Sequence, residues 1–89
     1  LSLENDRRFL QHLIDAQGAA WVREHMGKAI RTYDRHIRDG TMDPQFLSAY
    51  AETLERIIDQ EREPSTRRAL QETLNGAFQD ATGRPLSSY

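Results

Sequence analysis

The chain has 89 residues, which is enough for one domain only, because separate hydrophobic cores need roughly 50 residues or more each. It contains no cysteine, which excludes disulfides, thiolate metal sites and cysteine nucleophiles. The net charge is -2 and no long run of one charge sign occurs, so a nucleic-acid-binding tail is not expected. No apolar run approaches the roughly 20 residues of a membrane span, so a membrane anchor is not expected either.

We therefore expect a single helical domain over residues 1–89 with a thin core, because the hydrophobic fraction is 37% and small domains bury only about 60% of their unfolded surface. A second copy, forming a homodimer, would cover more apolar area. The chain begins at Leu1 and not at a methionine, so it is either processed or a piece of a longer protein. The absence of cysteine fits a reducing compartment, and we expect a cytoplasmic location.

The first expected helix covers residues 3–16, with Ser2 as N-cap and acidic residues in its first turn. Leu3, Leu10 and Ile14 form one apolar stripe, which Phe9 and Leu13 widen. Gly18 stands where a left-handed C-terminal cap is expected. His12 lies off the apolar stripe and is predicted to be solvated.

The second expected helix covers residues 19–38 and is the longest segment with one coherent apolar spacing. Its apolar residues recur every three or four positions: Val22, Met26, Ala29, Ile30, Tyr33 and Ile37. We predict that Ile30 and Tyr33 belong to the core. Trp21 falls off this face, and we expect it to pack against the end of the first helix, or to serve as an exposed aromatic anchor for a partner.

Two further helices are expected at residues 44–62 and 66–81. Asp43 followed by Pro44 predicts the start of the third helix, because Asp is a good N-cap and proline fits the first helical position. Pro64 is expected to end it, after which Ser65 or Thr66 would cap the fourth helix, which stops at Gly83. Residues 86–89 have no pattern and should fray unless Leu86 or Tyr89 folds back.

These elements predict an all-α fold, a compact four-helix bundle whose second and third helices form a long central antiparallel hairpin. Segment charges agree with this pairing, because residues 19–40 carry a charge of +2 and residues 41–64 carry -4. The bundle leaves little room for an active-site pocket. We therefore expect no enzymatic activity and no cofactor. We also expect no metal site, since His25 and His36 stand about 16 Å apart along one helix and cannot share an ion.

A second set of residues on the segment 19–38 forms what we call the basic stripe: Lys28, Arg31, Arg35 and Arg38. Such a stripe could bind phosphate, an acidic peptide or a nucleic-acid backbone. The alternative interpretation is a solvated face that is neutralised by Asp34, Asp39 and the acids of the third helix. Our leading hypothesis is a non-catalytic protein-interaction or regulatory module, whose partner is another protein or a second copy.

In the segment from Val22 to Gly40, an apolar residue and a glycine, Met26 and Gly27, precede a basic stretch. The segment resembles the helix-turn-helix of small excisionase-like and resolvase-like DNA-binding domains, where such a pair forms the turn before the recognition helix. The resemblance extends to Ile37 and Gly40 at its closing part. It implies DNA binding as an alternative function, through residues on the recognition helix: Arg31, Thr32, Arg35 and Arg38.

A helix that continues through Gly27 would instead bury Ile30 and expose Arg23 and Lys28. The course of the chain at Gly27 therefore distinguishes the two interpretations. His25 and Lys28 show a further spacing, HxxK, that resembles histidine phosphotransfer domains, which are helical bundles with an exposed histidine. That resemblance implies phosphotransfer at His25.

Overall fold

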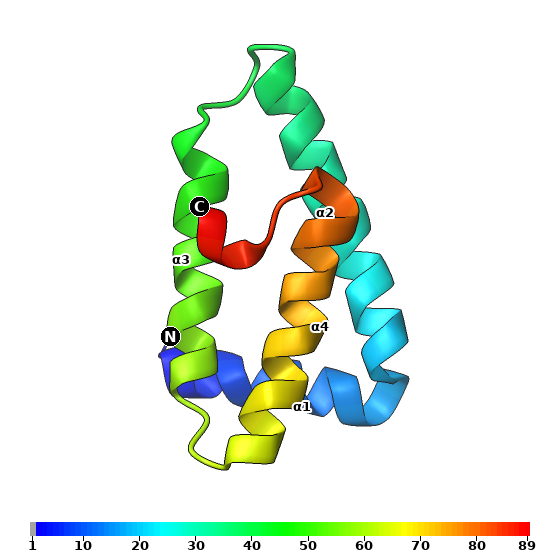
Figure 1. Ribbon diagram of the computed structural model, residues 1–89, viewed down its shortest axis with the longest axis vertical. Helices are drawn as coiled ribbons and strands as arrows, with labels where there is room; N and C mark the ends of the chain where they lie inside the picture. Colours follow the sequence, from blue (N-terminus) through cyan, green and yellow to red (C-terminus); the bar gives the residue numbers. More distant parts are fainter. Residues whose placement is uncertain (1) are drawn as a thin grey trace.

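The computed structural model describes residues 2–89 as four α-helices and a C-terminal 3-10 turn, which confirms the all-α four-helix prediction. Figure 1 shows α2 and α3 as two long sides joined at one end, α4 running between them, and α1 crossing the opposite end. The molecule measures 39 × 23 × 22 Å. The bounds are Leu3–Gln17 for α1, Ala19–Arg38 for α2, Gln45–Asp59 for α3, Pro64–Thr82 for α4 and Leu86–Ser88 for η1.

Helix α2 is unbroken through Gly27 and has the predicted bounds. It turns into α3 through Gly40, whose φ of 79° suits glycine, so the two helices form the expected hairpin. However, α2 packs most extensively on α4 and not on α3. Gly27 lies on the side of α2 that faces α4, because a Cβ built there would lie 3.7 Å, an ordinary contact distance, from the Ala77 carbonyl oxygen.

Between α2 and α3 the space is filled by aromatic side chains. Tyr33 lies edge-on to Phe46, with 5.0 Å between ring centroids, and its ring centroid lies 6.1 Å from that of Tyr50. Tyr33 is half-buried, so the prediction that it is a core residue holds only in part. We infer that these bulky rings keep α2 farther from α3 than from α4.

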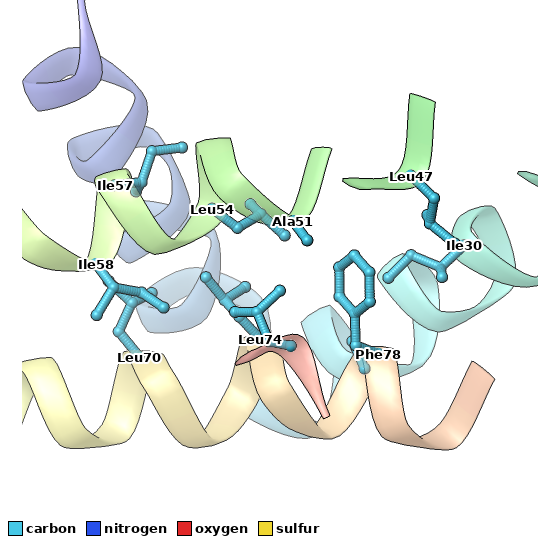
Figure 2. Packing of buried hydrophobic residues seen from close by; sticks show 11 residues of the cluster. Ile30, Leu47, Ala51, Leu54, Ile57, Ile58, Leu70, Leu74 and Phe78 are labelled. Carbon is cyan, nitrogen blue, oxygen red and sulfur yellow. The ribbon is translucent and has the colours of Figure 1, made fainter. Parts of the chain in front are cut away.

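The core lies where α2, α3 and α4 meet, and Ile30 is completely buried there, as predicted. Figure 2 shows Ile58 of α3 meeting Leu70 of α4, and Phe78 of α4 pointing toward Ile30 and Leu47. The residues of the buried cluster are Ile30, Leu47, Ala51, Leu54, Ile57, Ile58, Leu70, Leu74, Ala77, Phe78 and Leu86. Helix α1 contributes none of them and packs on the cluster only with half-buried side chains.

The predicted Ser2 cap is confirmed, whereas α3 begins at Gln45, one residue later than predicted, with Pro44 in place of Asp43 at its N-cap position. Ser2 accepts a hydrogen bond from the Asn5 backbone N–H at 3.1 Å, and the Asp43 carboxylate accepts one from the Gln45 N–H at 2.9 Å. Gly83 ends α4 in the left-handed conformation, with φ of 76°.

The predicted boundary between the third and fourth helices is wrong. Helix α3 already ends at Asp59, and Pro64 is the first residue of α4, where its missing N–H is tolerated. The cap is Glu63 and not Ser65 or Thr66: its carboxylate accepts from the Thr66 N–H and from both hydroxyls. These bonds lower the pKa of Glu63 to about 2, chiefly through the Ser65 and Thr66 hydroxyls.

The C-terminal segment folds back onto the bundle, which is the alternative to fraying. The Leu86 N–H donates to the Asn75 side-chain oxygen at 2.8 Å, and Leu86 is buried. The Tyr89 ring packs edge-on against Phe78 at 5.4 Å and lies under the Arg84 guanidinium. The apolar residues of this segment therefore complete the core.

Candidate interaction surface on helix α2

The members of the basic stripe differ in how they are neutralised. Lys28 pairs with Glu24 of the same helix at 3.6 Å, and Arg38 pairs with Asp34 at 2.9 Å. Arg31 and Arg35 are exposed, and neither forms an ion pair with another residue in the range 2–89. The stripe therefore presents two arginines whose guanidinium groups remain free to bind a carboxylate from outside.

The structure brings three of the four stripe residues together and separates the fourth. Arg31, Arg35 and Arg38 line one shallow hollow of about 480 Å³ beside Ala81 of α4. Lys28 does not line this hollow. Asp34 and Asp39 do, so the hollow has both signs of charge, with the arginines in excess by one.

The predicted neutralisation by the third helix is not observed, since no ion pair within residues 2–89 joins α2 to α3. The ion pair that links α2 to another helix goes to α4. Arg23 donates to both Asp80 carboxylate oxygens, at 2.7 and 2.9 Å. This bond from Arg23, more than the nearby charge of Arg31, lowers the pKa of Asp80.

Gly76 of α4 makes room for the Arg23 guanidinium. A Cβ built on Gly76 would lie 2.7 Å from the Arg23 Cζ, so a larger side chain would displace the arginine. The Arg23 and Asp80 positions are 57 residues apart, and no local spacing in the sequence relates them. Sequence reasoning placed Arg23 only as a solvated residue and missed this contact.

At Met26 and Gly27, where the helix-turn-helix resemblance requires a turn, α2 continues without a break. The Thr32 hydroxyl, matched to a recognition-helix position, donates to the Lys28 carbonyl oxygen of its own helix at 3.1 Å. The carboxylates of Asp34 and Asp39 stand in the same hollow as the arginines, where they would repel a phosphate backbone. These features favour the continuous-helix interpretation.

Trp21, for which we expected either packing against the end of the first helix or an exposed anchor position, lies outside the buried core. Its side chain is 39% exposed at the start of α2 and stacks on the His25 ring, with 3.8 Å between centroids. The His25 Nδ1–H donates to the Trp21 carbonyl oxygen at 2.9 Å. Helical spacing of four residues explains the pair, because residues i and i+4 lie one above the other. His25 is exposed, and His12 is solvated as predicted.

The remaining surface offers one larger groove, of about 550 Å³, between α3, α4 and η1. Carboxylates of Glu55, Asp59 and Glu72 and the Arg68 guanidinium line it, above Ile58 and Leu86. Among residues 2–89 no cluster of three or more His, Cys, Asp or Glu side chains is arranged to hold a metal ion. Within the same range, no helix is both long enough and apolar enough to cross a bilayer.

Comparison with protein-family models, with curated proteins and with solved structures gave no significant match.

Proposed function

We propose that the chain is a non-catalytic helical interaction module that binds an acidic segment of a partner protein through the exposed side of α2. The observation that carries the proposal is that Arg31 and Arg35 line one hollow and have no ion-pair partner within residues 2–89. Arg38, at the end of the same hollow, has a side chain that is 72% exposed, so its remaining N–H donors can reach a partner carboxylate while it stays paired with Asp34.

The chemistry of arginine supports an acidic protein segment as the ligand. The guanidinium group is planar and offers paired N–H donors that match a carboxylate, so adjacent arginines on one helix face can bind successive acidic side chains. Positions 31, 35 and 38 recur at helical spacing, which places them along one line of α2. Trp21 is our candidate for an additional aromatic anchor near the start of this helix.

Duplex DNA and a second copy of the chain are the alternatives that an experiment must separate. Asp34 and Asp39 disfavour DNA because they stand among the arginines, whereas a peptide can place its few carboxylates between them. A cytoplasmic location remains a prediction.

A binding titration tests the proposal. A fluorescently labelled hexaglutamate peptide is titrated with the wild-type chain and with the Arg31→Gln, Arg35→Gln double variant at low and physiological salt. We expect the double variant to bind at least about fivefold more weakly, and the wild-type affinity to fall with salt, because the contact is an exposed charge pairing. The matched control is Arg56→Gln plus Arg62→Gln, which removes two exposed arginines outside the stripe.

Light scattering of the same chains, alone and with a labelled DNA duplex, measures whether they form dimers or DNA complexes. The proposal would be contradicted if the stripe variant and the control variant weakened peptide binding equally. Sequence-dependent duplex binding that is lost in the stripe variant would replace it with DNA binding. A dimer that the stripe variant dissociates would identify the partner as a second copy.

A further inference from the structure

We propose that α1 is a detachable latch, which undocks from the bundle as one unit about Gly18 while α2, α3 and α4 remain folded. The buried cluster supports this because all of its members lie between Ile30 and Leu86. Helix α1 has no fully buried residue, in contrast to each of the other three α-helices. All side chains of the buried cluster therefore come from the part of the chain that follows α1, while α1 covers the cluster from outside.

The apolar contacts of α1 are shallow. Leu3, Leu10 and Ile14 are only half-buried, and Phe9 on the same helix is 62% exposed. A hollow of about 350 Å³, lined by Ile14 together with Ala69 and other residues of α4, separates the α1–α2 corner from α4. Because apolar stabilisation scales with the area removed from water, these contacts hold α1 less firmly than the core residues hold the other helices.

The connection between α1 and α2 suits a pivot. Gly18 is the single residue between the two helices, with φ of 96° and ψ of 148°. A Cβ built at Gly18 would find no atom within 4 Å, so no neighbouring group packs against this corner. Glycine also has the widest range of accessible backbone angles, which lowers the cost of changing the angle between α1 and α2.

One ion pair joins α1 to another element within residues 2–89, and it has the properties of a latch. Arg7 Nη1 lies 2.6 Å from Glu61 Oε2, and the two side chains are only 17% and 11% exposed. Glu61 is held in place on the α3–α4 connection: its other carboxylate oxygen accepts from the Glu63 N–H, and its carbonyl oxygen accepts from Arg67 Nε. Arg7 is thus the movable partner of a fixed acceptor.

Undocking would expose two apolar surfaces that are covered in the closed state. One is the stripe of α1 itself, and the other is the part of α2 and α3 on which α1 packs. Ile57 of α3 illustrates the second surface, since Figure 2 shows its side chain pointing away from Leu70 and Leu74 of α4. The open state would therefore expose apolar area that the closed state covers, and this inference does not depend on the proposed role of the basic stripe.

Native-state amide hydrogen exchange, measured by NMR, tests the latch. We expect the amides of residues 8–17 to exchange at least about tenfold faster than those of residues 70–78, after correction for intrinsic rates, through an opening that leaves α4 closed. The Arg7→Gln variant should increase exchange in α1 about tenfold further and leave α4 unchanged, because it removes the half-buried ion pair.

Arg8→Gln is the matched control, because Arg8 pairs with Glu4 within α1 at 3.2 Å and, among residues 2–89, its side chain forms no hydrogen bond or ion pair beyond that helix; it should change neither region. Equal protection of α1 and α4 in the wild-type chain would overturn the inference, and so would an Arg7→Gln variant in which both helices gain exchange by the same factor. The wild-type measurement decides the question by itself if the Arg7→Gln variant does not fold.

Discussion

Individual side chains fix the ends of the helices, and Glu63 is the clearest case. Its carboxylate accepts three hydrogen bonds at the start of α4, from the Ser65 hydroxyl and from the N–H and hydroxyl of Thr66, at 2.6 to 2.7 Å. The bonds favour the ionised form, and the proximity of the helix N-terminus favours a negative charge as well. The pKa of Glu63 in the folded chain is therefore about 2, against 4.5 for the free side chain.

This shift predicts the pH dependence of stability. Since the folded pKa lies below the unfolded one, the contribution of Glu63 is present above about pH 4.5 and is lost as the pH falls toward 2. We expect Glu63→Gln to have a lower free energy of unfolding than the wild-type chain at neutral pH, and this difference to disappear as the pH falls toward 2. Urea unfolding at a series of pH values between about 2 and 7 measures the difference, with the exposed Glu52→Gln on α3 as control. A wild-type advantage that stays constant down to pH 2 would count against the capping role.

Each helix combines features that the sequence reveals with packing that it does not. The bounds of α2 were predicted correctly because glycine at positions 18 and 40 marks both of its ends, and the apolar spacing marks its inner face. The start of α4 was predicted wrongly because Ser65 and Thr66 are themselves good caps, so local preference did not single out Glu63. Glycine at position 27 had two interpretations until its close approach to α4 was known.

Gly27→Ala tests the continuous helix. Its Cβ would meet only the Ala77 carbonyl oxygen and the Arg31 side chain, both at an ordinary contact distance of 3.7 Å. Alanine stabilises a helix interior by roughly 1 kcal/mol relative to glycine, so we expect a gain in the free energy of unfolding of up to about 1 kcal/mol. Thermal or urea unfolding provides the measurement. A marked loss of stability would contradict an unbroken helix that has room for an alanine side chain at this position.

Ile30→Ala tests the predicted core face of the same helix. The side chain is completely buried between α2, α3 and α4, so its truncation should cost roughly 2 to 5 kcal/mol. Ile37→Ala, at a half-buried position further along α2, should cost less. Equilibrium urea unfolding compares the two variants. A near-wild-type midpoint for Ile30→Ala would show that the core does not form around this residue.

Across the whole molecule, the sequence predicted the fold class and most elements, but not the contacts that hold the elements together. Arg7 and Glu61 are 54 residues apart, and Arg23 and Asp80 are 57 apart, so no helical periodicity relates either pair. The candidate site was predicted in part: Arg31, Arg35 and Arg38 gather in one hollow, while Lys28 does not line it. That distinction depends on how α2 packs against α4, which the spacing of residues along α2 does not reveal.

The inner side of α2 stabilises the bundle, and we propose that the side with the arginines binds an acidic segment of a partner. An amide chemical-shift titration with hexaglutamate tests that claim most directly, because it reports every residue of the chain at once. We predict that the shifts concentrate on residues 31–39 of α2 and on Ala81 of α4, with little change in the α3–α4 groove. Shifts that concentrate instead on residues 55–59 and 68–75, or no saturable shifts at low salt, would contradict it.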